Sequence, residues 1–316
     1  MKHITVNGKP LSQMSLGTVQ LGMNYGIAND QGQPDTAQST AMLNCALKNG
    51  ITSLDTARGY GTSEDVLGNF FKENPQENMP FITSKLRVEN PYASAKEIEA
   101  EMYTSVETSL KKLGINKLDC LLLHRGPGYT LADYGDAVRN TFARLIKDGY
   151  TDMVGASVYD PEEVDEMLLH DIYTATQVPM SLFDQKLITG GYTDRLKEKN
   201  IVVFVRSVFL QGVFFLDPDK MTDPLLVEYA KPYILKLREF CDRTGMSVAE
   251  FAISFMRDVP GVTSLVLGAD TEEQVLQNIA YMNAPTLSAD MRREVTEAFS
   301  NVDIPKIMEV LCRPKQ

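Results

Sequence analysis

Short runs of apolar residues alternate along the chain with longer segments in which apolar residues recur every three or four positions. The short runs are continuous, as in the stretch from Leu121 to Leu123, and do not alternate with polar residues. Strands of a parallel sheet that is covered on both faces have this composition. We therefore predict eight parallel strands, at residues 15–18, 52–57, 80–86, 118–124, 152–158, 175–179, 201–207 and 263–269.

The segments between these strands have the spacing of helices. One example is residues 93–113, whose apolar side chains recur at helical intervals. Helix-start signals occur at Pro34-Asp35, Ser63, Ser94, Leu131, Pro161-Glu162 and Thr271-Glu272-Glu273. Eight strand–helix units in 316 residues predict an α/β fold of the (β/α)8 TIM barrel type, as one domain over residues 1–316. A doubly wound open sheet is the alternative, but no Gly-x-Gly-x-x-Gly motif follows a strand to favour it.

Three further segments extend this barrel. Asn7-Gly8 is a strong turn signal and predicts an N-terminal β-hairpin that could close the bottom of the barrel. Residues 209–256 exceed what one strand–helix unit needs, and we expect a loop rich in Phe and Pro followed by two helices. Residues 288–302 predict a further C-terminal helix, capped by Ser288.

Composition narrows the possible partners. The net charge of -11 argues against a surface for nucleic acid or anionic membrane. The most apolar stretch, residues 201–216, is interrupted by Arg206 and Gln211 and is too short to span a bilayer.

The first residues lack a secretory signal, and we expect a cytoplasmic protein. Three histidines make a metal site improbable, and we interpret the four separated cysteines as reduced core thiols: Cys45, Cys120, Cys241 and Cys312.

Four chemically active side chains follow successive predicted strands. Barrel enzymes carry their reactive groups at the carboxyl ends of the strands. Asp55, Lys85 and His124 occupy those ends in the second, third and fourth strands, and Tyr60 lies in the loop after the second. Each residue alone is more often structural. Their occurrence on three successive strand ends predicts a catalytic site.

The four groups together suit proton transfer to a carbonyl oxygen. A free tyrosine has a pKa of about 10, and a neighbouring ammonium favours its phenolate. Lys85 can supply that charge, Asp55 can hold Lys85 protonated, and Tyr60 can then act as proton donor. His124 can orient the same carbonyl oxygen. The set contains neither a nucleophile nor a metal, so we expect the electrons to come as a hydride from a cofactor.

The sequence resembles the aldo-keto reductase family over nearly its whole length. The matching pieces are Leu16-Gly17-Thr18, Leu54-Asp55-Thr56-Ala57, Tyr60-Gly61, Ser63-Glu64, Thr83-Ser84-Lys85, Leu121-Leu122-Leu123-His124, Gly155-Ala156-Ser157, Gln177-Val178-Pro179, Arg206-Ser207 and Val266-Leu267-Gly268 through Asn278. The resemblance implies an eight-stranded barrel with an N-terminal hairpin, a bound NADP(H) or less often NAD(H), and a small carbonyl or alcohol substrate. It also implies that Tyr60 is the general acid–base of a tetrad with Asp55, Lys85 and His124.

The resemblance further implies a set of cofactor contacts. Ser157 and Gln177 would bind the nicotinamide carboxamide. The residues along the pyrophosphate would be Ser207, Phe209, Gln211 and Gly212, those near the adenosine Gly268, Gln274 and Asn278, and Thr18 and Arg206 complete the set. Three departures from the family pattern are Val158 in place of Asn, Arg206 in place of a stacking aromatic, and Gly268 and Gln274 in place of cations. Asp270, Glu272 and Glu273 lie alongside, so the preference between NADP(H) and NAD(H) stays open.

Substrate signals are fewer. The loop over residues 16–29 resembles that of a bacterial subgroup found with sugar and cell-surface carbohydrate pathways. Candidate substrate contacts are Gln20, Tyr25, Arg58, Arg125 and Tyr129, a set suited to a polyhydroxylated or anionic carbonyl compound. We therefore predict an NAD(P)-dependent oxidoreductase that interconverts a carbonyl, such as that of a sugar or keto-sugar, and an alcohol. The alternatives are a lyase or aldolase with a Schiff base on Lys85, a non-catalytic nicotinamide-binding sensor or regulatory subunit, and a redox-neutral reaction that uses the nicotinamide transiently.

Overall fold

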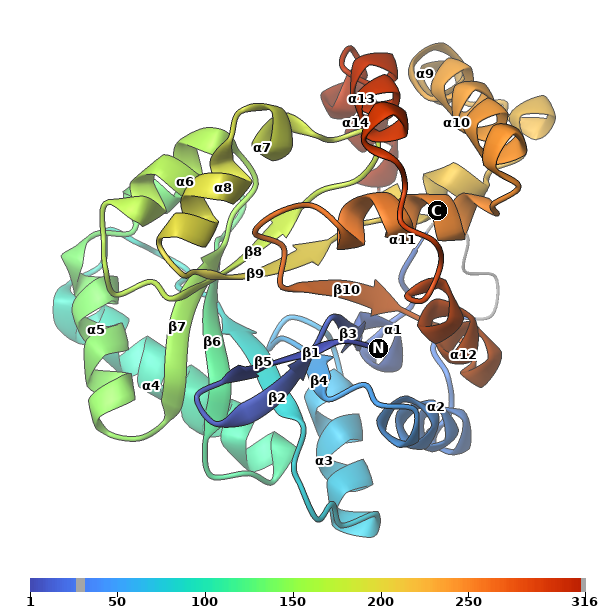
Figure 1. Ribbon diagram of the computed structural model, residues 1–316. Helices are drawn as coiled ribbons and strands as arrows, with labels where there is room; N and C mark the ends of the chain where they lie inside the picture. Colours follow the sequence, from blue (N-terminus) through green and yellow to red (C-terminus); the bar gives the residue numbers. More distant parts are fainter. Residues whose placement is uncertain (27–31, 314–316) are drawn as a thin grey trace.

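The computed structural model describes residues 1–26 and 32–313 and forms a closed parallel barrel of eight strands (Figure 1). The barrel strands follow one another in chain order, and the last pairs with the first. They are β3 (Met14–Gly17), β4 (Ser53–Asp55), β5 (Phe81–Leu86), β6 (Leu118–His124), β7 (Thr151–Ser157), β8 (Ala175–Pro179), β9 (Val202–Arg206) and β10 (Ser264–Gly268). This confirms the predicted (β/α)8 architecture. Residues 27–29 of the predicted substrate loop lie outside the described residues.

Helices surround the barrel. In chain order they are α1 (Val19–Gly22), α2 (Thr36–Lys48), α3 (Ser63–Glu73), α4 (Ala95–Leu113), α5 (Asp136–Lys147), α6 (Pro161–Leu168), α7 (Lys186–Thr189), α8 (Tyr192–Glu198), α9 (Pro224–Tyr229), α10 (Lys231–Thr244), α11 (Val248–Arg257), α12 (Glu272–Tyr281), α13 (Ala289–Ala298) and α14 (Ile304–Leu311). Three 3-10 turns cover Leu131–Asp133, Leu210–Phe215 and Pro218–Lys220. The late helices α13 and α14 lie beside α9 and α10, and α14 packs on α9 (Figure 1).

The N-terminal hairpin closes one end of the barrel. Its strands are β1 (His3–Val6) and β2 (Lys9–Ser12), joined by Asn7 and Gly8 with φ of 48° and 80°. Val6 and Leu11 pack inside the barrel against Phe81, the first residue of β5. The hairpin therefore lies where the strands begin, which leaves the carboxyl ends of the strands open for a site.

Helix starts follow the predicted capping residues in most cases. The side chains of Asp35, Ser94 and Thr271 each accept a hydrogen bond from a backbone N–H in the first turn of the helix that follows. The start predicted at Leu131 is wrong. Residues 131–133 form only a 3-10 turn, because Gly135 is extended (ψ −162°), and α5 begins at Asp136.

Two further expectations need correction. Cys312 is exposed at the end of α14, so it is not a core thiol, whereas the other three cysteines are buried and free. The excess chain after β9 is also more helical than expected. It holds two 3-10 turns and three helices, and a short apolar helix, α14, follows the predicted C-terminal helix. No helix in the described ranges is both long and apolar enough to cross a membrane.

Candidate active site

Lys85 is the centre of a buried polar cluster at the carboxyl end of the barrel. Its Nζ lies 2.7 Å from Asp55 Oδ1, 2.9 Å from the carbonyl oxygen of Thr56 and 3.3 Å from the Tyr60 hydroxyl. The lysine side chain is fully buried and the Asp55 side chain nearly so. The three donor positions of the ammonium are thus filled by a carboxylate, a backbone carbonyl and a phenol. The structure therefore brings together three of the four residues predicted to be catalytic.

The ion pair determines the charge of Lys85. Burial lowers the pKa of this lysine, but the Asp55 carboxylate, with a smaller contribution from Tyr60, outweighs burial and raises the pKa above its ordinary value. The amine is therefore an ammonium at neutral pH. Because a Schiff base forms only from a neutral amine, this ion pair counts against the lyase or aldolase alternative.

Asp55 is held from both of its carboxylate oxygens. Its Oδ2 accepts a hydrogen bond of 2.7 Å from the amide nitrogen of Gln177, on the opposite side of the barrel. Thr18 holds the backbone of Asp55, because its hydroxyl donates to the Asp55 carbonyl at 2.8 Å. Thr18 is fully buried, and its hydroxyl also accepts a bond from Ser63, so the structure gives it a supporting position behind Asp55.

The rings of Tyr60 and His124 lie next to each other in an edge-to-face arrangement. Their ring centroids are 6.3 Å apart and the rings are nearly perpendicular. Burial, followed by the positive charges of Lys85, Arg87, Arg206 and Arg125, lowers the pKa of His124 to about 3. The imidazole is therefore neutral at physiological pH, with one N–H to donate and one nitrogen to accept.

This neutral histidine makes the protein sensitive to acid. Between pH 6.5 and 3 the unfolded chain binds a proton at this position while the folded protein does not, so stability falls as the pH falls through that window. When the pH is lowered from 6.5 to 4, we expect the free energy of unfolding of the wild-type protein to fall by about 3 kcal/mol more than that of His124→Gln. The free energy of unfolding in urea at each pH measures this effect. The control His3→Gln removes an exposed imidazole. An equal acid loss in wild type and His124→Gln would contradict the assignment.

A stack of three side chains lies next to His124. Two guanidinium groups lie over the Tyr159 ring, with the Cζ of Arg125 at 4.1 Å and the Cζ of Arg206 at 4.4 Å from its centroid. Arg125 is anchored by Glu163 at 3.0 Å and by the Tyr129 carbonyl at 2.6 Å. Sequence reasoning missed Tyr159. The available signal was its position two residues after Ser157, at the end of β7.

The segment after β9 has a strained backbone. Ser207, Leu210 and Gln211 have φ of 63°, 48° and 53°, and Gly212 has φ of 99°. Non-glycine residues adopt this left-handed conformation at a cost, and such outliers concentrate at ligand sites. The N–H groups of Leu210 and Gly212 donate to the carbonyls of Ser207 and Phe209 at 2.7 and 3.0 Å. Phe209 packs on Phe215 with ring centroids 5.2 Å apart. The four residues predicted to line the pyrophosphate thus lie together in this strained segment.

The three residues predicted to lie near the adenosine are at the end of β10 and on α12. Gly268 has no side chain, and a Cβ at this position would lie only 2.2 Å from the side-chain amide nitrogen of Gln20. Asn278 donates to the Gly268 carbonyl at 3.1 Å and ties α12 to β10. Gln274 is exposed, and its side-chain oxygen accepts the Asp270 N–H at 2.7 Å. Residues 268–278 contain no lysine or arginine.

The opposite side of the mouth is hollowed toward α4. A cavity of about 550 Å³ is lined by Lys85 and His124, two of the residues predicted to be catalytic, and by residues of the loops and of α4, among them Arg58, Gly59, Arg87, Glu89, Glu101 and Thr104. Arg58 is paired with buried Glu64 at 2.9 Å. Arg87 was not predicted. It follows Lys85 by two positions, so strand alternation carries it to the same side.

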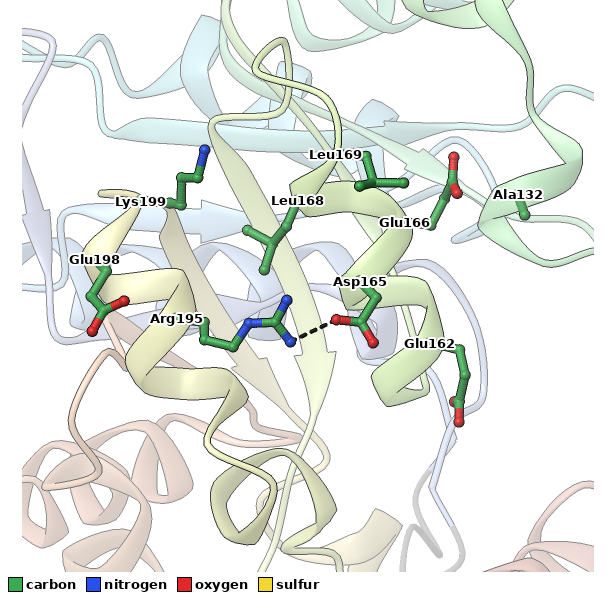
Figure 2. Close-up of a pocket in the computed structure, with 9 residues that line it drawn as sticks. All are labelled: Ala132, Glu162, Asp165, Glu166, Leu168, Leu169, Arg195, Glu198 and Lys199. Carbon is green, nitrogen blue, oxygen red and sulfur yellow. Dashed lines mark hydrogen bonds and ion pairs between the residues drawn. The ribbon is translucent and has the colours of Figure 1, made fainter.

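Two further predicted substrate residues, Tyr25 and Tyr129, lie in the segments after α1 and β6. Tyr25 is partly exposed and lies within electrostatic range of Tyr60 and Arg206, and burial raises its pKa. Tyr129 is half-buried and packs edge-on against Tyr134. A second cavity, of about 460 Å³, lies elsewhere between α6 and α8 (Figure 2). It contains none of the predicted site residues, and its Arg195 is paired with Asp165 at 2.6 Å.

The chain is similar in sequence and in fold to known proteins. The model of the aldo/keto reductase family matches residues 13–299. L-glyceraldehyde 3-phosphate reductase of Escherichia coli O157:H7 is 24% identical over 94% of this chain and 92% of its own length. NADH-specific methylglyoxal reductase of Escherichia coli K12 is 26% identical over 91% of this chain and 95% of its own. A solved aldo-keto reductase from Bacillus halodurans, in its holo form, superposes with a TM-score of 0.76 at 22% identity and covers 94% of this chain and 96% of its own.

Proposed function

Because this chain belongs to the aldo/keto reductase family and is an NAD(P)-dependent carbonyl reductase, we propose that Tyr60, Lys85, Asp55 and His124 form its catalytic site. The observation that carries this proposal is the position of the Lys85 ammonium. It is fully buried, paired with Asp55 at 2.7 Å and 3.3 Å from the Tyr60 hydroxyl. A buried charge that is paired in this way polarises the phenol, and a surface lysine would not.

The side chains have separate roles in this proposal. Tyr60 gives its hydroxyl proton to the substrate oxygen as negative charge develops there, and it takes the proton back in the direction of oxidation. Lys85 holds a positive charge beside the phenol oxygen, and Asp55 keeps that charge in place. His124 is neutral and donates one hydrogen bond to the same substrate oxygen. A bound nicotinamide supplies the hydride.

The cofactor is held by residues of β7 to β10 in this proposal. Ser157 is next to both His124 and Gln177 in the strand register, so it stands close to the reacting centre. The Nε2 of Gln177 is committed to Asp55, and its Oε1 can accept from the carboxamide. The strained segment from Ser207 to Gly212 would carry the pyrophosphate, and Gly268, Gln274 and Asn278 would carry the adenosine.

We further propose that NADH and NADPH bind with comparable affinity. A 2′-phosphate gains affinity from nearby cations, and residues 268–278 contain carboxylates and no cation. The E. coli relative named NADH-specific methylglyoxal reductase supports the same direction.

Direct titration tests this preference. We expect dissociation constants for the two reduced cofactors within about tenfold of each other, which corresponds to about 1.4 kcal/mol. The rise in nicotinamide fluorescence on binding measures both constants without a substrate. NADPH binding more than about 100-fold tighter than NADH binding would contradict the proposal.

The substrate is a small carbonyl compound, and we propose a short sugar-like aldehyde or ketone as its class. The polar side chains of Gln20, Arg58 and Tyr129 around the mouth suit hydroxyl groups. The relative named L-glyceraldehyde 3-phosphate reductase supports this class. A panel of sugars and simple aldehydes, followed at 340 nm with each cofactor, tests the proposed function. Hydroxylated aldehydes should have the highest kcat/KM, and equal kcat/KM for plain alkyl aldehydes would count against a sugar-like substrate.

A further inference from the structure

The positive charges at the mouth differ in whether the protein neutralises them. Lys85 is paired with Asp55, Arg58 with Glu64 and Arg125 with Glu163. Arg206, at the end of β9, has no carboxylate partner within ion-pair distance in the described part of the chain. Asp184 is a buried carboxylate within electrostatic range of Arg206, but its ion-pair partner is Lys186, at 3.9 Å.

Arg206 is nevertheless buried in part and held in place. Its Nη2 is inaccessible to solvent and has no hydrogen-bond partner among the described residues. Its Nη1 reaches the Ser207 hydroxyl at only 3.5 Å. A buried guanidinium N–H without an acceptor is costly, so such a group in a folded protein calls for an explanation.

The stack explains how Arg206 is fixed. The Cζ of Arg206 lies 4.4 Å and that of Arg125 4.1 Å from the centroid of the Tyr159 ring. Arg125 is itself fixed by its ion pair with Glu163. The aromatic ring attracts both cations, which offsets their mutual repulsion. The stack thus holds a rigid cation at the mouth, and the Arg206 side chain is partly exposed and has no carboxylate partner among the described residues.

We propose that Arg206 is an oxyanion-binding site, built by Tyr159 and Arg125, for a phosphate or carboxylate group of a bound ligand. A guanidinium fork matches the planar oxygen pairs of both groups. Two sources can supply the anion, namely the pyrophosphate of the dinucleotide and a carboxylate of the substrate. The strained segment that begins at Ser207 adjoins the site on one side, and His124 lies within electrostatic range on the other. The inference rests on the proposed function only in placing both ligands at this mouth.

Arg87 provides a matched comparison. It also lies near His124, and no carboxylate in the described residues pairs with it, but it is exposed and no aromatic ring contacts it. Arg87→Gln therefore removes the same formal charge from the same mouth without removing a built site. A general effect of positive charge would appear equally in Arg87→Gln and Arg206→Gln.

Calorimetric titration of the full-length protein tests the proposal without turnover. The first arm titrates ADP-ribose, which carries the pyrophosphate without the nicotinamide. The second titrates succinate into protein saturated with NADP+. We expect Arg206→Gln to weaken one of these ligands by at least about tenfold and Arg87→Gln to weaken it by about twofold or less. A loss for ADP-ribose assigns the anion to the cofactor, and a loss for succinate assigns it to the substrate.

Variants of Tyr159 test whether the site is built by the stack. Tyr159→Leu should lose part of the same affinity, and Tyr159→Phe, which keeps the ring, should retain it. The loss in Tyr159→Leu should disappear when Arg206 is already glutamine. Unchanged binding of both ligands in Arg206→Gln, or equal losses in Arg206→Gln and Arg87→Gln, would overturn the proposal. Because no step requires reduction of a carbonyl, a failure of the proposed function would appear separately, in the 340 nm assay.

Discussion

Replacing Tyr60 with phenylalanine should lower kcat by about 10²- to 10⁴-fold, the range that one general acid contributes. The change removes only the hydroxyl that lies 3.3 Å from Lys85 Nζ. The ammonium keeps its bonds to Asp55 and Thr56, so the fold and the cofactor site should persist. Steady-state kinetics at 340 nm measure the loss, and nicotinamide fluorescence measures the retained binding.

The matched control for this variant is Tyr192→Phe. It deletes a tyrosine hydroxyl on α8 that bonds to Asp165 at 3.2 Å, far from the mouth. This variant should turn over like the wild type. Near-normal activity in Tyr60→Phe would rule out the proposed mechanism, and a loss of cofactor binding in the same variant would show that the residue acts through the cofactor.

Replacing Lys85 with methionine should abolish most turnover and also destabilise the fold. The substitution leaves the buried Asp55 carboxylate with only Gln177 and no cation, and removal of one partner from a buried ion pair costs about 3–5 kcal/mol. Urea unfolding measures this cost. The double variant Lys85→Met with Asp55→Asn removes the uncompensated charge, so it should recover part of the stability and none of the activity.

Lys117→Met controls for the loss of a lysine from an ion pair. Lys117 directly precedes β6 and is paired with Asp152 at 2.9 Å, and the two side chains are 47% and 34% exposed. Exposed pairs contribute about 0–1 kcal/mol, so this variant should unfold at nearly the wild-type urea concentration and keep full activity. Equal stability losses in Lys117→Met and Lys85→Met would contradict the account of the buried pair.

The juxtaposition of the proposed catalytic residues could be predicted from the sequence because topology alone brings them together. Asp55, Lys85 and His124 end three successive strands, and parallel strands of one barrel deliver their carboxyl ends to one face. The prediction needed strand order and no side-chain geometry. Helix starts at Asp35 and Ser94 were equally accessible, because an N-cap acts on its own first turn.

Contacts across the barrel could not be predicted in this way. The Gln177 amide reaches Asp55 over a separation of 122 residues, a contact that depends on barrel closure and on one rotamer. The Arg125–Tyr159–Arg206 stack combines the ends of three strands, and none of these residues has a motif that identifies the others. The exposed position of Cys312 depends on α14, which lies beyond the last predicted element.

A single-turnover experiment tests the central claim most directly. Wild-type protein and Tyr60→Phe, each in excess over NADPH or NADH, are mixed with a small hydroxyaldehyde, and absorbance at 340 nm is followed with the alcohol product quantified. The account predicts that wild-type protein oxidises the bound cofactor with one alcohol formed per cofactor, and that Tyr60→Phe does so at least about 100-fold more slowly. Equal rates in the two proteins, or no oxidation in wild type with any aldehyde of the panel, would contradict it.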